Sequence, residues 1–418
     1  MTNPTHLPTP PPSPDFAPAW LVEAARDVLR RNLVVTADGH RYIRPAPMTY
    51  EHQWLWDSCF HAIVNTYLDP ALAQDELETL VSRPVAEGPD QGMLPHMIYW
   101  SGGGADLWGR DDRSTITQPP VIAYAVERVY QVTQDTAFVR RVYPALKAYH
   151  DWWVRRRDPD GDGLVTLIHP WETGWDAAPA WDALLGLRSP ADAESRAARM
   201  ALVPRLAALD YDAEAVQAAG LFNVETCDLN ALYLVSLDAM TRLAALVAPD
   251  DAATFQARRA QTAEAIQTKL WDERLGLYVD LAGADETPLP PGSAAAFVPL
   301  FAGLPTPEQA ARLVRRLSDP AEFWPAYPVP TVALTHPEFA PDRYWRGSSW
   351  PHLNWMLALG LRRYGYTVLA DELTQRCLAL VQAHGFWEYY NPLTGAGLGA
   401  TPQSWTTLIL DMLAAQRV

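Results

Sequence analysis

The feature that most constrains the fold of this 418-residue chain is a helical spacing of apolar residues that recurs from residue 20 almost to the C-terminus. In the first such segment, apolar residues from Leu21 to Leu29 lie three and four positions apart and therefore share one face of a helix. The same spacing predicts helices over 20–33, 55–68, 71–85, 118–133, 137–156, 225–247, 252–271, 307–317, 349–364, 367–383 and 403–416. Strand-like alternation is sparse, with 163–168 and 276–281 as the best candidates. The sequence therefore predicts an all-α fold.

The segments between these helices alternate between short connections and long ones rich in Trp, Gly and Asp. This alternation indicates helical hairpins in an inner and an outer ring, with the long loops gathered on one face, as in an (α/α) barrel of about six hairpins. A superhelical array of repeats is the alternative, but no fixed-period self-similarity occurs. Because no internal shift in composition marks a linker, we expect one domain over 16–418, preceded by a disordered Pro-rich tail over 1–15.

Charge and cysteine content exclude several classes of protein. The net charge of -16 argues against nucleic acid and membrane surfaces as partners. The three cysteines lie far apart without a CxxC pair, and the histidines show no HExxH spacing, so we expect neither a disulfide framework nor a catalytic zinc. The chain also lacks a P-loop, a GxGxxG and a G-x-S-x-G motif, and we expect no cofactor.

The N-terminal region has no basic stretch followed by an apolar run, and no stretch of about 18 uncharged apolar residues occurs. We therefore expect no signal peptide, no membrane-spanning helix and a cytoplasmic protein. A homo-oligomer is compatible with the sequence.

The segment HPWETGWDAAPAWD, residues 169–182, concentrates acids and tryptophans around backbone-breaking Gly and Pro. A carboxyl buried beside indole rings has a raised pKa, so it stays protonated near neutral pH and can donate a proton. Asp176, followed by small residues that let a ligand approach, is a candidate acid of this kind. The alternative is that Asp176 caps a helix, as Asp182 is also suited to do.

If Asp176 is the proton donor of a glycoside hydrolase, the reaction requires a second carboxyl. The best match is Glu388, which lies between aromatic residues in the sequence GFWEYYNP, residues 385–392. A salt-bridged loop acid is the alternative for this residue. Three further polar and aromatic clusters lie at the N-terminal ends of predicted helices, and together they indicate a cleft. They contain Tyr50, Trp54, Trp56 and Asp57, then Gln118, and then Tyr344, Trp345, Arg346 and Trp350.

The sequence DPDGDG, residues 158–163, has the aspartate spacing that begins an EF-hand calcium loop. The twelfth position is His169 rather than Glu, and no predicted helix pair frames the loop. We interpret it as an acidic turn and expect no metal site. Residues 99–113, with Gly102–Gly104 followed by Trp108, suit either a lid or a simple flexible loop.

Three motifs resemble those of a known family: WETGWD at 171–176, YWRGSSW at 344–350 and FWEYYNPLTG at 386–395. They are similar to motifs of the (α/α)6-barrel glycosidases related to glycoside hydrolase family 63 and to trehalases. Within that group the resemblance is strongest to the bacterial mannosylglycerate and glucosylglycerate hydrolases. It covers roughly residues 20–415 and implies a toroidal barrel with long active-site loops on one face, and an inverting α-glycosidase.

The resemblance also implies a role for each matching residue. Asp176 matches the general acid and Glu388 the general base. Residues around the bound hexose are matched by Tyr50, Trp54, Trp56, Asp57, Gln118, Arg346, Trp350 and Gln403. Residues at the glycerate end are matched by Tyr344, Trp345, Arg205 and Tyr211, and a tyrosine on a mobile closing loop is matched by Tyr99.

The implied activity is hydrolysis of mannosylglycerate, glucosylglycerate or both to hexose and glycerate. The small-molecule substrate would thus carry an anionic glycerate aglycone. The alternative enzyme is trehalase-like or an oligosaccharide α-glucosidase acting on a neutral α-glucoside with the same two carboxyls. A sugar-binding or scaffold protein that has lost catalysis is a third hypothesis, against which the presence of both carboxyls argues.

Overall fold

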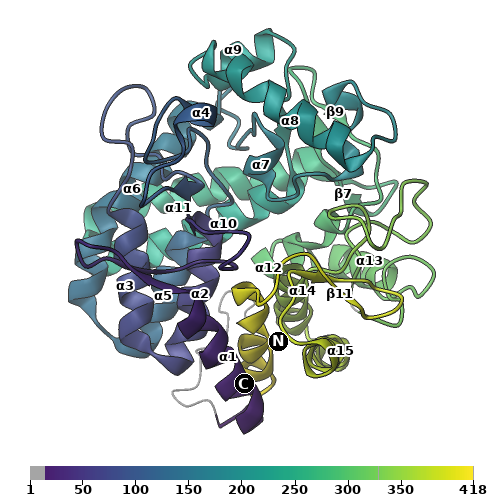
Figure 1. Ribbon diagram of the computed structural model, residues 1–418. Helices are drawn as coiled ribbons and strands as arrows, with labels where there is room; N and C mark the ends of the chain where they lie inside the picture. Colours follow the sequence, from purple (N-terminus) through teal and green to yellow (C-terminus); the bar gives the residue numbers. More distant parts are fainter. Residues whose placement is uncertain (1–14, 328, 418) are drawn as a thin grey trace.

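The computed structural model describes residues 15–327 and 329–417. Its helices form two concentric rings (Figure 1). The inner ring consists of α2 (Leu55–Leu68), α5 (Ile122–Thr133), α10 (Cys227–Val247), α12 (Pro299–Ala302) with the preceding turn η4 (Ala294–Phe297), α14 (Pro351–Arg363), and η5 (Ser404–Leu408) with α16 (Ile409–Ala414). Each of these contacts the next, and η5 contacts α2, which closes the ring.

The outer ring packs against the inner one and is formed by α1 (Ala19–Asn32), α3 (Pro70–Val81), α6 (Thr136–Arg157), α11 (Pro249–Ala265), α13 (Pro307–Leu317) and α15 (Thr367–His384). The predicted (α/α)6 barrel is thereby confirmed. The two ends of the barrel meet where α1, purple in Figure 1, contacts the C-terminal yellow segment at η5.

Burial patterns explain why these segments form rings. In α2 every residue from Leu55 to Tyr67 is buried, as expected for a helix enclosed on all sides. In outer helix α13 the buried residues Ala310, Leu313, Val314 and Leu317 follow a three- and four-residue spacing, so only one face packs inward. A capping box between Thr306 and Gln309 begins that helix.

The connections from inner to outer helices are only one to four residues long. Asp69 alone joins α2 to α3, and its side chain caps α3 by accepting a hydrogen bond from the Leu72 N–H at 3.1 Å. Asp135 caps α6 in the same way, accepting from the Phe138 N–H at 3.0 Å. These side-chain caps satisfy the first backbone N–H groups of the outer helices within tight turns.

The connections from outer to inner helices are long and carry all of the named strands. These strands pair antiparallel: β1 (Leu33–Val35) with β2 (Arg41–Ile43), β3 (Gln53–Trp54) with β4 (Met97–Ile98), β8 (Leu281–Ala282) with β5 (Val224–Glu225) and β9 (Thr287–Pro288), β6 (Trp271–Asp272) with β7 (Leu277–Tyr278), and β10 (Tyr389–Tyr390) with β11 (Gly397–Leu398). All of the long connections therefore arrive at the N-terminal ends of the inner helices.

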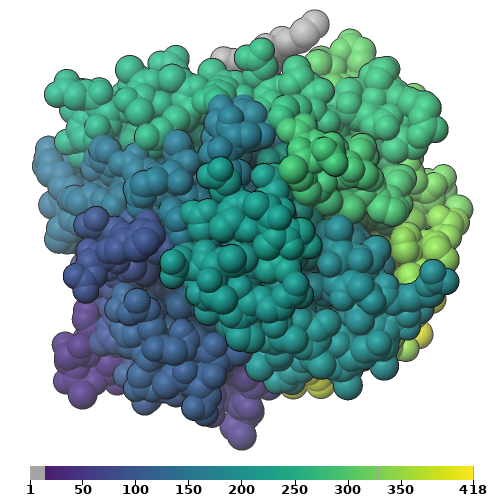
Figure 2. Space-filling view, turned by 90° about the horizontal axis from the view of Figure 1, so that it is seen from above, coloured from purple at the N-terminus to yellow at the C-terminus, as the bar shows by residue number. Residues whose placement is uncertain are grey.

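The longest connection, residues 158–226, rises above the rings at the top of Figure 1. It contains α7 (Pro170–Thr173), the turns η1 (Pro179–Trp181) and η2 (Ala183–Leu185), α8 (Asp192–Ala207) and α9 (Ala213–Ala218). Figure 2 looks down on this face, and the teal residues of this connection spread across its middle. The connection before α5 adds α4 (Ala105–Trp108).

One cluster of buried apolar side chains extends from Leu21 to Ala415. Within it, the buried Asp411 on α16 accepts hydrogen bonds from Arg128 on α5, from Tyr67 on α2, and from the Trp355 indole on α14 at 2.7 Å. A buried carboxylate needs such donors to offset its loss of hydration. The hydrogen bonds of Asp411 link the last inner helix to three others and so hold the ring closed.

Several predicted boundaries shift for local reasons. The helix predicted over 118–133 begins at Ile122, because Pro119 and Pro120 do not favour an earlier start. The strand predicted over 163–168 is reduced to a single bridge between Leu167 and Val224. The short inner helix α12 had no predicted counterpart, because one helical turn is too short for a periodic pattern.

Among the described residues, α10 is the one helix long and apolar enough by composition to cross a membrane, and 67% of its most apolar window is buried. Its place in the inner ring accounts for its apolar composition. The predicted tail over 1–15 lies, except for Asp15, outside the described residues. The single domain over 16–418 stays a prediction.

Candidate active site

A cavity opens at the N-terminal ends of the inner helices, where the long connections converge. Its walls are formed by Pro45, Tyr50, Trp54, Trp56, Asp57, Gln118, Gly174, Asp176, Tyr344, Trp345, Glu388, Gln403 and Trp405. The structure thus brings together in one cavity both predicted catalytic carboxyls and eight of the other predicted residues. These residues come from five separate connections and from the first turn of α2, so only the closed ring assembles them.

Asp176 follows the short helix α7 and faces this cavity. Gly174 ends α7 in the left-handed region with φ of 77°, and a Cβ atom there would lie 2.5 Å from the Trp56 ring, so only glycine fits. Burial raises the pKa of Asp176 to about 6, opposed by the charge of Arg199 and by the Tyr344 hydroxyl, which donates at 3.4 Å. Asp176 is not the N-cap residue of any described helix.

Glu172 anchors the segment that carries Asp176. This buried carboxylate forms an ion pair with Arg157 at 2.9 Å and accepts a hydrogen bond from the Ile168 N–H at 2.9 Å. His169 caps α7 by accepting from the Trp171 N–H at 3.0 Å. These contacts tie the connection to the end of α6 and so hold Asp176 in place.

Glu388 immediately precedes β10 and is 2% exposed. Its Oε1 accepts a hydrogen bond from the Tyr50 hydroxyl at 2.7 Å, and its Oε2 accepts one from the Ala400 N–H at 2.8 Å. Burial raises the pKa of Glu388 to about 7, although both hydrogen bonds favour the ionised form. The position of the Glu388 carboxylate requires glycine at position 399, because a Cβ atom there would lie 2.4 Å from Oε2 of Glu388.

Two tyrosines connect the carboxyls. The Tyr50 hydroxyl bonds Glu388, the Tyr344 hydroxyl bonds Asp176, and the two tyrosines also interact with each other. The negative charge of Asp176 in turn raises the pKa of Glu388. The two acids are therefore electrostatically linked across the cavity, and a proton on one affects the charge of the other.

The cavity wall also carries buried polar atoms that have no hydrogen-bond partner in the protein. They are Oδ1 of Asp57, both amide atoms of Gln403, and the indole N–H groups of Trp54 and Trp345. Buried polar groups in folded proteins are nearly always satisfied, so such a concentration indicates a polar ligand. Indole faces beside polar groups suit the apolar faces and hydroxyls of a sugar ring.

Two predicted hexose-binding residues lie behind the wall. Arg346 donates paired hydrogen bonds to Asp182 at 3.0 and 2.7 Å and a third to Glu338 at 2.9 Å. The paired geometry predicted for Arg346 is present, but its partner is protein, and Asp182 therefore makes no capping hydrogen bond. Trp350 is fully buried and stacks on Trp345 with ring centroids 3.8 Å apart. Both residues support the wall rather than line it.

Three predicted residues lie away from this cavity. Tyr99 is 7% exposed, and its hydroxyl accepts from the Trp108 indole at 3.0 Å. Tyr211 lines a separate cavity together with Trp108, Arg110 and Arg113. Arg205 is exposed on α8, so the structure does not bring it to either carboxyl.

Sequence reasoning missed one residue of the cavity wall and one charged residue that acts on Asp176. Trp405 lines the cavity and donates to the backbone oxygen of Glu388 at 3.0 Å. Its position two residues after Gln403 was a usable signal. Arg199 is buried and its charge reaches Asp176, while its guanidinium donates to Ser195 at 2.7 Å. No motif in the sequence marks Arg199, because only the fold of the 158–226 connection brings it near.

The family model of the mannosylglycerate hydrolase MGH1-like glycoside hydrolase domain matches residues 50–406. The chain belongs to this family of glycoside hydrolases. A mannosylglycerate hydrolase of Thermus thermophilus is 35% identical, over 92% of this chain and 98% of its own length. The glucosylglycerate hydrolase of Mycolicibacterium hassiacum is 28% identical, over 96% of this chain and 100% of its own length.

Among solved structures, a mannosylglycerate hydrolase from Thermus thermophilus in complex with Tris and D-glycerate superposes with a TM-score of 0.85. It is 33% identical, and the match covers 94% of this chain and 99% of that structure. The predicted family membership and glycoside hydrolase class are confirmed.

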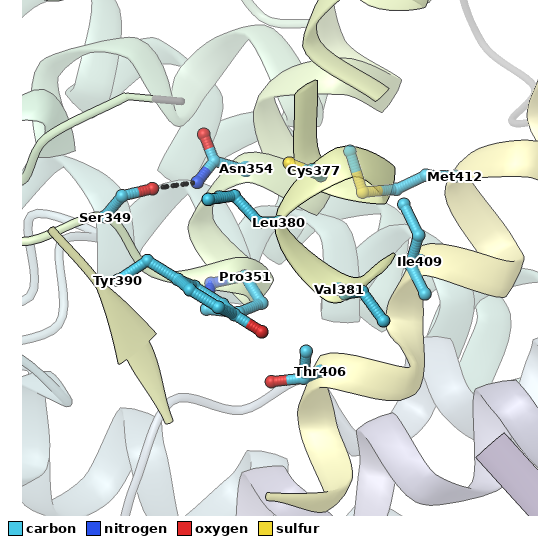
Figure 3. Close-up of a pocket in the computed structure, with 10 residues that line it drawn as sticks. All are labelled: Ser349, Pro351, Asn354, Cys377, Leu380, Val381, Tyr390, Thr406, Ile409 and Met412. Carbon is cyan, nitrogen blue, oxygen red and sulfur yellow. Dashed lines mark hydrogen bonds between the residues drawn. The ribbon is translucent and has the colours of Figure 1, made fainter. Parts of the chain in front are cut away.

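A further small cavity lies between α14, α15 and α16 (Figure 3). Cys377, Leu380, Val381, Ile409 and Met412 give it a largely apolar wall, and it has room for no more than about one water molecule. This cavity is a packing gap and is too small to bind a sugar.

Proposed function

We propose that this glycoside hydrolase cleaves mannosylglycerate, glucosylglycerate or both to hexose and glycerate, with inversion at the anomeric carbon. The observation that carries the proposal is the pair of carboxyls, Asp176 and Glu388, in one cavity with different hydrogen-bond surroundings. Glu388 accepts two hydrogen bonds of 2.8 Å or less, whereas Asp176 accepts one contact of 3.4 Å from Tyr344.

These surroundings assign the two roles. Hydrogen bonds to a carboxylate favour its ionised form, so Glu388 is the general base that deprotonates the attacking water. Asp176 is the general acid that protonates the glycosidic oxygen. The chain of two tyrosine hydroxyls between the carboxyls supports a separation with room for a water molecule, as inverting enzymes require.

The raised pKa values refine this assignment. The pKa of Glu388 is about 7 and that of Asp176 about 6, so the free enzyme near pH 6.5 holds roughly one proton on the pair, mainly on Glu388. The productive form has that proton on Asp176. A substrate hydroxyl or the attacking water beside Glu388 would add a donor to Glu388 and shift the proton toward Asp176.

The hexose would lie against Trp54 and Trp56, with its hydroxyls on Asp57, Gln118 and Gln403. The unpartnered atoms of Asp57 and Gln403 support this placement, because sugar hydroxyls would satisfy them. Arg346 and Trp350 position the wall behind Trp345.

For the glycerate carboxylate we propose Arg199 in place of Arg205. Arg199 is 7% exposed and its Nε–H has no partner in the protein, whereas Arg205 is exposed on α8. A buried guanidinium near the acid suits an anionic aglycone that leaves from Asp176. We propose the segment 99–113, with Tyr99 and Trp108, as the lid. Tyr211 would belong to the separate cavity that it lines together with Trp108, which the lid borders.

The test is a substrate panel of mannosylglycerate, glucosylglycerate and trehalose with the wild-type enzyme and the Asp176→Ala and Glu388→Ala variants. We expect turnover of a glycerate-bearing substrate by the wild-type enzyme and loss of it in both variants, with circular dichroism spectra unchanged. Turnover of trehalose alone would contradict the proposed substrate, and near-normal kcat in either variant would contradict its role. A cytoplasmic location, a possible homo-oligomer and a single domain over 16–418 are retained as predictions.

A further inference from the structure

A second group of acids lies outside the active site, where the turn after α6 meets β5 and the β8–β9 hairpin. Single oxygen atoms of Asp158, Asp160 and Asp162 lie within 4.8 Å of one another. Asp162 also belongs to a group with Glu225 and Glu286 in which the oxygens meet the same limit. Asp162 therefore joins the two groups into one cluster of five carboxyls.

The cluster contains carboxylate oxygens that the protein leaves unsatisfied. Glu225 is 8% exposed, and its buried Oε2 has no hydrogen-bond partner. The buried Oδ1 of Asp158 has none either. An unpaired buried carboxylate oxygen is costly, so its presence beside other acids indicates a cation as the missing partner.

The protein supplies one cation to this cluster. The Lys269 ammonium contacts Asp162 and donates to Glu286 at 2.5 Å. One positive charge does not balance five carboxyls, and it leaves Asp158 and Glu225 unpaired.

The turn itself is rigid. The Leu164 N–H donates to Oδ1 of Asp162 at 2.7 Å, and Gln261 and Thr262 of α11 donate to the Gly161 and Gly163 carbonyls, each at 2.8 Å. The aspartate side chains are thus presented from a backbone that is already fixed in place, which lowers the conformational entropy that binding costs.

We propose that this cluster binds a calcium ion, with carboxylate oxygens of Asp158, Asp160, Asp162 and Glu225 as ligands. Calcium accepts six to eight oxygen ligands at about 2.3–2.6 Å and tolerates many carboxylates, whereas magnesium usually keeps several waters and takes one or two. The aspartate spacing is that of an EF-hand loop, and Glu225 on β5 supplies the carboxylate that His169 does not. The acidic turn inferred from the sequence is thus assigned a ligand.

The position of this site indicates which part of the structure a bound cation would stabilise. It joins the end of α6, β5 and the β8–β9 hairpin, at the base of the connection that carries Asp176. A bound cation would stabilise that connection without touching the active-site cavity, because no residue of the cluster lines it.

The test is isothermal titration of the full-length, EGTA-dialysed enzyme with CaCl2, without substrate, so the result does not depend on the proposed hydrolysis. We expect saturable binding of one ion and a melting temperature raised by about 3 °C at a hundredfold excess over Kd. Glu225→Gln and Asp160→Asn should each weaken binding by about tenfold or more. Asp285→Asn, which changes an exposed acid of the same hairpin, should leave binding unchanged.

No heat and no thermal shift at up to about 10 mM CaCl2 would overturn the proposal and leave Lys269 as the cluster's cation. Equal binding by wild-type, Glu225→Gln and Asp160→Asn enzymes would also overturn it, because the ion would then bind elsewhere. A parallel titration with MgCl2 should give weaker binding, and equal affinity would contradict the assignment of calcium.

Discussion

The Tyr50 hydroxyl donates to Oε1 of Glu388 at 2.7 Å. Glu388 accepts its second hydrogen bond from the Ala400 N–H, and both bonds lower a pKa that burial raises. Tyr50 therefore determines how readily Glu388 ionises, and its ring also packs edge-on against Trp54 in the hexose wall. One residue thus couples the proposed base to the proposed sugar site.

Tyr50→Phe tests this coupling. Loss of the hydrogen bond raises the pKa of Glu388, the higher of the two, so the basic limb of the kcat/KM profile moves to higher pH and a smaller fraction of the enzyme has its proton on Asp176. A hydrogen bond to a charged group contributes about 1.5–3 kcal/mol, which corresponds to a roughly 10- to 150-fold loss of kcat/KM. The measurement is the pH–rate profile of the variant. An unchanged basic limb would separate Tyr50 from the ionisation of Glu388.

The wild-type pH profile should be bell-shaped. The base must be ionised, so activity rises as pH increases through the lower apparent pKa of the pair. The acid must keep its proton, so activity falls as pH increases through the upper one. With pKa values of about 6 for Asp176 and about 7 for Glu388, kcat/KM should peak between these values. A plateau extending above about pH 9 would contradict a titrating acid.

Asp176→Asn should lose about 10²- to 10⁴-fold in kcat on a glycerate-bearing substrate, because the leaving oxygen is no longer protonated. A glycoside with an acidic phenol as leaving group does not need that proton, so the variant should cleave it nearly as fast as the wild-type enzyme does. Kinetics on both substrates provide the test. Equal losses on the two would mean that Asp176 is not the acid.

Arg199→Met should raise KM for the glycerate-bearing substrate about tenfold or more while affecting a neutral phenyl glycoside far less, because only the former carries a carboxylate. Loss of the Arg199 charge should also raise the pKa of Asp176, the lower of the two, and move the acidic limb to higher pH. Arg205→Met is the matched control, since that residue is exposed on the same helix. If Arg205→Met alone impaired the glycerate substrate, our assignment would be reversed.

Asp411→Ala should destabilise the barrel by about 3–5 kcal/mol, because it leaves the Arg128 guanidinium buried without its carboxylate partner. Asp371→Ala removes the exposed partner of Arg362 and should cost no more than about 1 kcal/mol. Chemical denaturation of the two variants provides the comparison. Similar losses of stability would contradict the role of Asp411 in closing the ring.

The ring helices could be predicted from the sequence because their apolar spacing is local. Helices such as 55–68 and 307–317 have the predicted bounds. The location of Arg199 could not be predicted from the sequence, because its proximity to Asp176 depends on how the 158–226 connection folds back. The partners of Arg346 were also hidden, since a sequence shows a donor but not whether Asp182 or a sugar accepts its hydrogen bonds.

Proton NMR of the first hexose released from an α-linked glycerate substrate tests the proposed mechanism most directly. A water activated by Glu388 attacks the face opposite to the leaving group, so the β-anomer should appear first and the α-anomer only through later mutarotation. Initial release of the α-anomer would show a retaining route and would contradict the roles assigned to Asp176 and Glu388.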